Sequence, residues 1–184
     1  PVVIWAIINR GGEQAAQHSQ SLQAIFAHIP GLKVVMPSTP YDAKGLLIAS
    51  IKDDNPVIFI DDRWLYKVTG EVPQEIYTVP IGKGIIRKEG EDVTIAATSY
   101  MANEAMKAAI SLEKEGIRAE VIDIRTIKPI DEAIIFASVK KTGRLVIVDG
   151  GWKTCGIAAE ISALVVENVF AYLKAPVMRV TLPD

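Results

Sequence analysis

Several residue types that would indicate particular classes of protein are scarce in this chain. Cys155 is the single cysteine among 184 residues, which excludes an internal disulfide and every metal site built from several cysteines. A lone cysteine fits a reducing compartment, and we expect Cys155 to be a small buried residue. Charge of one sign is not in excess either, because 20 Lys and Arg oppose 22 Asp and Glu. The sequence therefore predicts no nucleic-acid partner.

Long hydrophobic runs are also missing. No apolar segment reaches the length of a membrane span, and the N-terminus lacks the basic and then apolar pattern of a signal peptide. We therefore predict a soluble, cytoplasmic chain with no membrane partner, although a missing N-terminal segment leaves an organelle matrix open. With 49% hydrophobic residues, the chain can bury one large core or two smaller ones.

Both ends of the chain have the composition of strands. The chain begins at Pro1 rather than at methionine, and residues 1–8 already have the pattern of a buried strand. A second β-branched run, residues 176–182, lies directly before the final residues of the chain. We interpret the chain as a fragment of a longer protein.

Short β-rich runs alternate with helical patterns, which is typical of an α/β fold with mostly parallel sheets. Residues 61–80 interrupt this alternation with prolines and mixed polar residues, so they predict a linker that crosses a surface. Thr39, Pro40 and Asp42 predict the cap and first turn of a helix that continues over 43–51. The predicted strands are 1–8, 32–36, 57–60, 93–98, 119–124, 144–149 and 177–182, and the other predicted helices are 19–28, 102–115, 131–141 and 156–171.

His18 is the strongest candidate for chemistry. It lies between a glycine turn, Gly11-Gly12, and the predicted helix 19–28, which Ser19 or Ser21 can cap. Free backbone N–H groups at a helix start suit anionic ligands and disfavour the charged imidazolium, so a neutral ring can exchange protons near physiological pH. From this segment alone, proton transfer and a structural hydrogen bond within the loop are equally supported.

Residues 50–56 end the predicted helix 43–51 with a high density of oxygen atoms. The final carbonyls of a helix lack intrahelical partners and carry negative partial charge, and Asp53 and Asn55 add carboxylate and amide oxygens. Such a cluster can hold a hard cation. A solvated helix end, with Asn55 setting the turn before Pro56, is the more frequent arrangement.

Gly150-Gly151-Trp152 follows the predicted strand 144–149, at the end of a parallel strand where ligands often bind. The helix after Gly156 could also offer its N-terminus to an anion. Because no titratable residue accompanies the glycines, we favour a tight turn in which Trp152 covers a domain interface. His28 ends the predicted helix 19–28, where a C-terminal capping role is expected.

Taken together, these motifs resemble the β subunit of the decarboxylase component of pyruvate dehydrogenase. Related β subunits of branched-chain 2-oxo acid and acetoin dehydrogenases share them, and transketolase is a more distant relative. The similar motifs occur in the family's order along the whole chain, at residues 17–21 (QHSQS), 26–35 (FAHIPGLKVV), 37–47 (PSTPYDAKGLL), 53–58 (DDNPVI), 125–129 (RTIKP) and 150–152 (GGW).

The resemblance implies a thiamine diphosphate enzyme whose cofactors bind between the subunits of an α/β heterotetramer. It implies that residues 1–62 are the C-terminal part of a pyrimidine-binding domain, that residues 63–80 are a linker and that residues 81–184 are a transketolase C-terminal-like domain. The implied reaction is the oxidative decarboxylation of a 2-oxo acid with acyl transfer to a lipoyl group. His18 matches the family's active-site histidine, which would hold the intermediate and manage a proton.

The resemblance also implies metal ions. In potassium-binding members, a structural potassium ion contacts the positions that match Val2, Ser50, Ile51, Asp53 and Asn55. The magnesium and diphosphate ligands of the family belong to the α subunit, so we expect none in this chain. The glutamate that activates the cofactor lies upstream of the first residue in this family, and we therefore expect the fragment alone to be inactive.

The implied partners are an α subunit, a second β subunit, a lipoyl acyltransferase and a small 2-oxo acid. Substrate identity stays open, because Ile25 replaces an aromatic residue of many relatives and residues 61–64 replace a more usual acidic and apolar stretch. One alternative function is a non-catalytic assembly module that docks the α subunit or the acyltransferase. Another is a transketolase-type or synthase-type enzyme for sugar phosphates, which predicts basic residues near His18, where only Arg10 is close.

Overall fold

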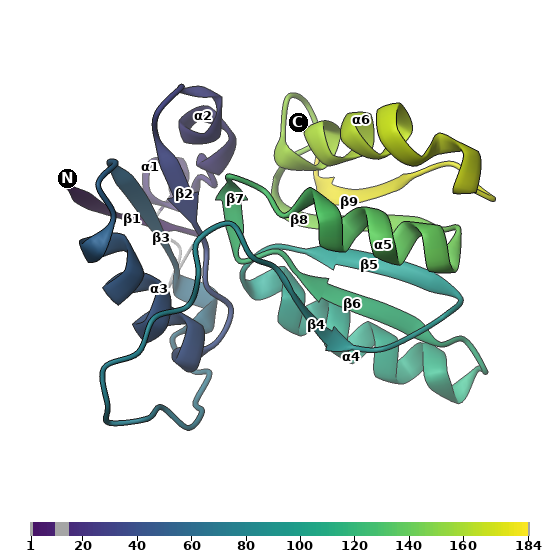
Figure 1. Cartoon of the computed structure of the whole chain (residues 1–184), viewed down its shortest axis with the longest axis horizontal. Coiled ribbons are helices and arrows are strands. Elements are labelled where there is room, and N and C mark those ends of the chain that lie inside the picture. Colours follow the sequence, from purple (N-terminus) through teal and green to yellow (C-terminus); the bar gives the residue numbers. More distant parts are fainter. Residues whose placement is uncertain (1, 10–14, 184) are drawn as a thin grey trace.

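The computed structural model describes residues 2–9 and 15–183, and the side chains of Ala16 and His18 are outside this description. Two β-sheets, each with its own helices, stand side by side and are joined by a long connection (Figure 1). The structure thus confirms the predicted mixed α/β fold with mostly parallel sheets. No helix within the described residues is long and apolar enough to cross a membrane.

The first sheet combines the N-terminal third of the chain with one strand from much later in the sequence. Its elements are β1 (Val3–Ile8), α1 (Ala15–Ser19), α2 (Gln23–His28), β2 (Lys33–Val35), α3 (Pro40–Lys52), β3 (Val57–Asp62), the short 3₁₀ helix η1 (Arg63–Leu65) and β7 (Thr126–Lys128). The strand order is β1-β3-β2-β7, and only β7 pairs in the antiparallel direction. Val34 and Ile58 pack on the side of α2, whereas Val35 and Phe59 pack on the side of α3.

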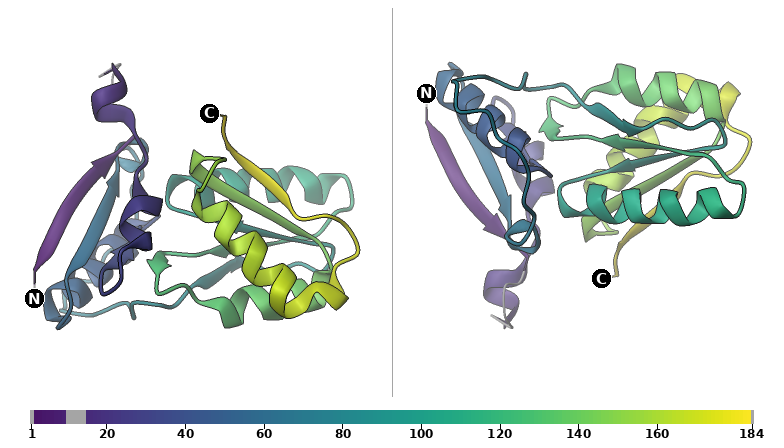
Figure 2. Two further views of the ribbon diagram at one scale, coloured as in Figure 1. Left: turned by 90° about the horizontal axis from the view of Figure 1, so that it is seen from above. Right: turned by 90° about the horizontal axis from the view of Figure 1, so that it is seen from below.

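The second sheet has helices on both faces. Its elements are β4 (Ile85–Lys88), β5 (Val93–Ala97), α4 (Tyr100–Lys114), β6 (Ala119–Asp123), α5 (Glu132–Thr142), β8 (Leu145–Trp152), α6 (Ile157–Val169), the 3₁₀ helix η2 (Phe170–Tyr172) and β9 (Met178–Leu182). The strand order is β4-β6-β5-β8-β9, with β4 antiparallel to β6 and the other pairs parallel. Ala102 and Ala105 of α4 pack on one face, and Ile135 of α5 and Ile161 of α6 pack on the other (Figure 2).

The carboxyl ends of the parallel strands of both sheets meet in one region, which we call the junction. Ser38, which follows β2, donates a hydrogen bond from its hydroxyl to Asp123 at the end of β6. Ser99, which follows β5, donates to the carbonyl oxygen of Pro37 at 3.2 Å. Ligands of parallel α/β sheets bind outside the carboxyl ends of the strands. The junction is therefore the part of the molecule where a functional site is expected.

The predicted elements are present with shifted ends, and the departures have physical causes. The predicted helix 19–28 is divided, because residues 20–22 leave helical geometry between α1 and α2. The strand that begins at Val57 continues to Asp62 because β1 pairs with it as far as Ile8. The sequence pattern does not reveal β4 and β7, since both are short antiparallel additions that depend on distant partners.

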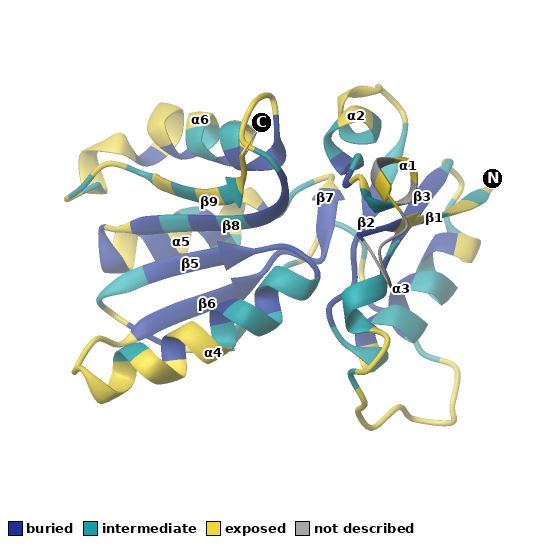
Figure 3. Ribbon diagram, turned by 180° about the vertical axis from the view of Figure 1, so that it is seen from behind, coloured by how far each residue is buried: buried dark blue, intermediate teal, exposed yellow. Residues whose placement is uncertain are grey.

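Two expectations near the end of β8 are wrong. Gly150 and Gly151 form no tight turn, because β8 continues through them to Trp152, which pairs with Leu182 of β9. The strand is largely buried along this stretch (Figure 3). Cys155 is exposed rather than buried, because it lies in the connection between β8 and α6 and not in either element.

Candidate functional site

The part of the chain that carries His18 lies between Asn9, which directly follows β1 at the junction, and α2. We define the His18 segment as residues 15–23, which comprise α1 and the start of α2. The side chain of His18 and all of Arg10 lie outside the described residues, so the roles given to them stay predictions. The expected cap at Ser19 or Ser21 is wrong, because α2 has Leu22 as its cap residue and no side-chain cap hydrogen bond.

Ser21 instead holds the base of the segment. Its hydroxyl donates to Oδ1 of Asn9 at 3.0 Å, and both side chains are buried. Asn9 directly follows β1 and has a φ of 58°, a left-handed conformation that asparagine adopts more readily than most residues. The carbonyl oxygen of Asn9 also accepts a hydrogen bond from Arg63 of η1 at 3.3 Å. Asn9 is thus joined by hydrogen bonds both to Ser21 and to Arg63, the residue that directly follows β3.

Gln23 connects the His18 segment to the second sheet. Its Nε2 donates to Oδ1 of Asp149 on β8 at 3.0 Å, and the two side chains are 1% and 2% exposed. Thr98, which follows β5, donates to the same oxygen at 2.6 Å, and the backbone N–H of Gly151 donates to Oδ2 at 3.2 Å. This small network joins α2, β5 and β8 at the carboxyl ends of the second sheet's central strands.

The glycine at position 151 makes the contact possible. A Cβ on Gly151 would lie 2.9 Å from Nε2 of Gln23 and 2.7 Å from Oδ2 of Asp149, distances that ordinary side chains do not tolerate. Glycine within a strand often marks such a close approach of another group. Two consecutive glycines at the end of a predicted strand were therefore the sequence signal for this contact, although they do not identify Gln23 as the partner.

Two buried carboxyl groups border the same region. Burial raises the pKa of Asp62 at the end of β3, although the hydrogen bond from the backbone N–H of Trp64 opposes the shift. Burial also raises the pKa of Asp149 above its usual range, against the opposing hydrogen bonds from Thr98 and Gln23. Ionisable groups with shifted pKa values gather at functional sites more often than elsewhere. Sequence reasoning missed both, because an acid at a strand end has no distinctive local pattern.

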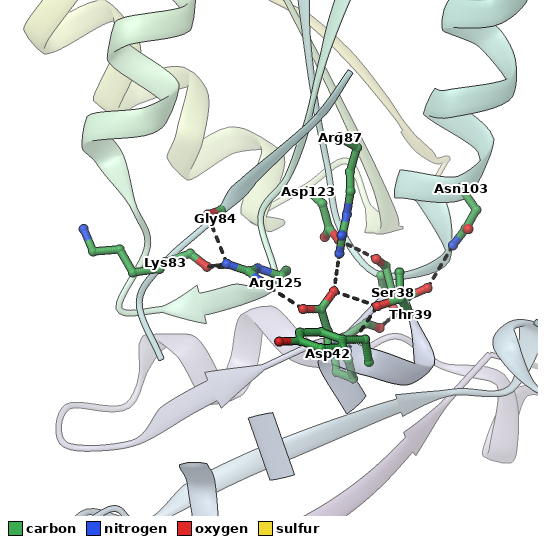
Figure 4. Close-up of polar contacts among 12 residues, drawn as sticks. Ser38, Thr39, Asp42, Lys83, Gly84, Arg87, Asn103, Asp123 and Arg125 are labelled. Carbon is green, nitrogen blue, oxygen red and sulfur yellow. Dashed lines mark hydrogen bonds and ion pairs between the residues drawn. The ribbon is translucent and has the colours of Figure 1, made fainter. Parts of the chain in front are cut away.

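A second polar cluster at the junction fastens the two sheets together through charged groups (Figure 4). Asp42, in the first turn of α3, accepts a hydrogen bond from Nη1 of Arg125 at 2.9 Å and also pairs with Nη2 of Arg87. The same guanidinium nitrogen of Arg87 lies 2.8 Å from Oδ2 of Asp123. Thr39 caps α3 as predicted, because its hydroxyl accepts from the backbone N–H of Asp42 at 3.1 Å. The cap thus also orients the carboxylate that both arginines contact.

The electrostatics of this cluster indicate a structural role. Burial alone would raise the pKa of Asp42, but the Thr39 hydroxyl and the guanidinium groups of Arg87 and Arg125 outweigh it and lower the pKa. Burial raises the pKa of Asp123, and the neighbouring Arg87 offsets this shift only in part. Each charged group in the cluster has a partner of opposite charge. This charged cluster is therefore better suited to holding the two sheets together than to transferring protons.

At the predicted cation site, the carboxylate of Asp53 is already paired. Its Oδ2 lies 2.5 Å from Nζ of Lys33, and its Oδ1 accepts from the backbone and side-chain nitrogens of Asn55 at 2.9 and 3.0 Å. The Lys33 ammonium and the Asn55 N–H groups lower the pKa of Asp53 to about 2. Lys33 and Asn55 therefore already occupy the two carboxylate oxygens of Asp53 that the sequence offered to a metal ion.

The other residues of the predicted cation site lie around the same turn. The carbonyl oxygen of Val2 accepts from the backbone N–H of Val57 at 2.9 Å, which brings the start of β1 beside the turn. Ser50 is buried and its hydroxyl donates to the carbonyl of Leu46 at 2.7 Å, whereas the Ile51 side chain is 63% exposed. The carbonyl oxygen of Ser50 accepts from the backbone N–H of Asp53 at 3.3 Å. The cation at this turn stays a prediction.

A cleft of about 590 Å³ lies between α2, the connection from β7 to α5, and the start of α6. His28, in the last turn of α2, and Lys128 line it, together with Glu132 and Glu160. The cleft includes the N-terminus of α6, which the sequence offered to an anion. The carboxylates of Glu132 and Glu160 on its wall disfavour an anion, whereas the ammonium group of Lys128 favours one, so the anion stays a prediction.

The chain is similar to known protein families and to individual known proteins. Residues 1–69 match the transketolase pyrimidine-binding domain, and residues 82–184 match the transketolase C-terminal domain. The chain is 49% identical over 183 residues to the β subunit of acetoin:2,6-dichlorophenolindophenol oxidoreductase from Bacillus subtilis, covering 100% of this chain and 54% of that protein. It is 46% identical over 185 residues to the pyruvate dehydrogenase E1 component β subunit of the same organism, covering 100% and 57%.

A solved structure has the same overall arrangement. It is described as a split gene transketolase in the form of an inactive β4 tetramer, and it superposes with a TM-score of 0.81 at 26% sequence identity. The match covers 99% of this chain and 57% of that chain. The chain therefore spans just over half the length of the curated relatives and of the solved structure.

Proposed function

The chain belongs to the transketolase family, and we propose that it is part of the β subunit of a thiamine diphosphate-dependent 2-oxo acid dehydrogenase. The proposed reaction is the oxidative decarboxylation of pyruvate or a related 2-oxo acid, with transfer of the acyl group to a lipoyl acceptor. The observation that carries the proposal is the 46% identity to a pyruvate dehydrogenase β subunit along the entire chain. The proposed domains are residues 1–62 and 81–184, with residues 63–80 as the linker.

We propose His18 as the catalytic residue that this chain contributes. Ser21 fastens its segment to Asn9 at the carboxyl end of β1, and Gln23 fastens it to Asp149 on β8. Such anchoring holds a proton donor or acceptor in one place relative to a substrate, which general acid and base catalysis requires. In this arrangement His18 would exchange a proton with the 2-oxo acid or with its acyl product.

We propose thiamine diphosphate as the cofactor of the complete enzyme. When bound, it supplies the electron sink on which a 2-oxo acid loses carbon dioxide. The residues at the junction fit a polar ligand, because the buried Oε1 of Gln23 has no hydrogen-bond partner among the described residues and Asp62 and Asp149 are buried nearby. We assign the magnesium ion and the diphosphate group to the α subunit, as the family resemblance implies.

We also propose a structural potassium ion at the turn after α3, with Val2, Ser50, Ile51, Asp53 and Asn55 around it. Because Lys33 already pairs with the Asp53 carboxylate, the ion would use main-chain carbonyl oxygens. Potassium chloride should then raise the melting temperature of the complete protein above that in sodium chloride at equal concentration. Equal melting temperatures in the two salts would remove the ion from the proposal.

The proposed protein partners are an α subunit, a second β subunit and a lipoyl acyltransferase. One relative is named as the β subunit of an E1 component, and the solved structure is named as a tetramer. Ile4 and Trp5 of β1 are 49% and 58% exposed. Because the proposed domain includes residues 1–62 only as its C-terminal part, the rest of that domain would cover this strand in the complete protein, and the exposure does not by itself mark a subunit interface.

The experiment that tests the function uses the full-length parent protein with its α partner. Thiamine-dependent turnover of pyruvate, branched-chain 2-oxo acids and acetoin would be measured for the wild type, for His18→Ala and for His28→Ala. We expect His18→Ala to lower acyl transfer to the lipoyl acceptor by about 10² to 10⁴, the usual range for removing a general acid or base. His28→Ala is the matched control, since it removes the chain's other histidine at the end of α2.

Each result separates the candidate functions. Undiminished acyl transfer in His18→Ala would exclude His18 from the mechanism. Stable co-purification with an α subunit or acyltransferase, without any turnover, would favour the assembly module. Turnover of sugar phosphates in place of 2-oxo acids would favour a transketolase-type enzyme.

A further inference from the structure

The His18 segment is held at two points by side chains from different parts of the molecule. Ser21 bonds to Asn9 within the first unit, whereas Gln23 bonds across the junction to Asp149 of the second sheet. The second contact joins residues that are 126 positions apart in the sequence. Apolar residues of α2 also pack against the core cluster that contains Ile147 of β8 and Ile161 of α6. The Gln23–Asp149 hydrogen bond adds to this packing a directional contact that no local structure enforces.

We propose that Asp149, acting through Gln23, is a positioning residue that sets where the His18 segment lies over the junction. The proposal rests on the proposed function of His18, but the placement of the segment can be measured independently of catalysis. Asp149 itself would not touch the substrate.

The chemistry of the contact supports a positioning role. A buried carboxylate must be satisfied by donors, and Asp149 receives them from Gln23, Thr98 and the backbone of Gly151. Thr98 and Gly151 belong to the framework of the second sheet and hold the carboxylate in one orientation. Gln23 is the donor that comes from the other unit. Because the Gln23 side chain is neutral, its contact with Asp149 is a hydrogen bond and not an ion pair. Such a bond depends on direction, so it fixes the orientation of the Gln23 side chain relative to β8.

Asp149 directly follows the regularly paired part of its strand. β8 pairs with β5 and β9 as far as Val148 and with β9 again at Trp152, so Asp149 lies next to a regular part of the sheet, in an irregular stretch of the β8–β9 pair. Gly151 leaves the space that brings the Gln23 amide against the strand, because a Cβ there would lie 2.9 Å from Nε2. Gly151 leaves the space and Asp149 provides the acceptor for one side chain of α2, that of Gln23.

The test compares variants in the full-length protein with its α partner. Gln23→Met keeps the side chain's length and removes the donor, and Asp149→Asn removes the charge while keeping the shape. We expect each variant to lower kcat about tenfold or more and to change KM for the 2-oxo acid less than about twofold, because misplacement of a catalytic group affects the reacting state more than binding. The double variant should be no worse than the more affected single variant, since both changes break one contact.

Amide hydrogen exchange supplies the second measurement. Backbone amides of residues 15–23 should exchange faster in Gln23→Met than in the wild type, while those of β5 and β8 should not change. Ser138→Ala is the matched control, because it removes a buried hydroxyl that bonds Thr94 at 2.6 Å in the same unit without touching the His18 segment. We expect this control to leave both kcat and the exchange of residues 15–23 unchanged.

The outcomes distinguish this proposal from the proposed function. Unchanged exchange in Gln23→Met, additive effects in the double variant, or an equal loss of kcat in Ser138→Ala would each overturn the positioning role. Faster exchange in Gln23→Met together with an active His18→Ala variant would support the positioning of the segment while contradicting the role of His18.

Discussion

The two sheets are built on the same parallel plan, but they take their strands from the chain in different ways. In both sheets the interior strands are buried, as Ile58 of β3 and Ile147 of β8 show. In both sheets an outer strand is exposed, since Trp5 of β1 is 58% and Val180 of β9 is 56% exposed. The first sheet, however, includes β7 from the later part of the chain, whereas the second takes all of its strands from residues 85–182. The first sheet therefore depends on the later part of the chain for one of its strands, and the second sheet does not depend on the earlier part.

This difference matches the division of roles proposed here. The first unit carries His18 and the turn after α3, which are the candidate functional elements. The second unit provides fixed groups against which those elements are placed, namely Asp149 for the His18 segment and Arg87 and Arg125 for α3.

The largest effect is expected from Asp42→Ala, which removes the carboxylate that holds both arginines. Arg125 is only 8% exposed and would lose its anionic partner, so we expect unfolding free energy to fall by about 3–5 kcal/mol. Because the loss weakens the contact between the sheets, the first sheet should unfold before the second. Urea unfolding followed by tryptophan fluorescence and by far-UV circular dichroism would then give two separate transitions.

Arg118→Ala is the control for Asp42→Ala. Arg118 pairs with Glu91 at 2.7 Å, but the two side chains are 57% and 64% exposed, so its removal should change stability by less than about 0.5 kcal/mol. If Asp42→Ala unfolded in one transition with a similarly small loss, the charged cluster would not be what joins the sheets.

A pair of isoleucine variants tests the difference between inner and outer strands. Ile147→Ala should lower the unfolding free energy by about 2–5 kcal/mol, because it opens a cavity in a fully buried part of β8. Ile4→Ala should cost less than about 0.5 kcal/mol, because the side chain is 49% exposed on β1. The measurement is again urea unfolding. Equal losses would mean that β1 is covered in solution, for example by a second copy of the chain.

Whether the sequence predicts a contact depends on how far apart the two residues are along the chain. Thr39 and Pro40 predict the start of α3 because capping involves neighbouring residues, and the cap hydrogen bond is present at 3.1 Å. The parallel strands are likewise predicted by their own composition. The Gln23–Asp149 contact joins residues 126 positions apart, and no local pattern contains that information. The glycine beside Asp149 suggests a close approach, but only the structure identifies the residue that approaches.

The family resemblance predicts the relatives correctly, and it assigns roles to His18 and to the cation residues. The structure adds Lys33, which pairs with the Asp53 carboxylate and so competes with a cation for it. The resemblance does not mention this lysine. Lys33 lies in a strand, and Asp53 follows α3, so their pairing at 2.5 Å depends on the parallel packing of β2 beside β3. A sequence pattern that lists oxygen atoms cannot show which of them already has a partner. The pairing of Asp53 with Lys33 is therefore the feature of the predicted cation site that sequence reasoning did not include.

The smallest expected effect concerns this pair and is visible through its pH dependence. Lys33 and Asn55 lower the pKa of Asp53 from 3.8 to about 2, so the folded state binds a proton less readily than the unfolded state. The stabilisation is present above pH 4 and is lost as the pH falls toward 2. Because the side chains are 27% and 15% exposed, Lys33→Met should cost less than about 1 kcal/mol at pH 7.

The difference in unfolding free energy between the wild type and Lys33→Met should therefore shrink between pH 4 and pH 2, as measured by urea unfolding at several pH values. Lys52→Met is the matched control, because it removes an equal charge from an exposed lysine at the end of α3. A loss that stayed constant with pH, or that appeared equally in Lys52→Met, would show that net charge and not the Asp53 contact is responsible. A loss confined to Lys33→Met would instead show that the first unit stabilises this turn with its own lysine, independently of the second sheet.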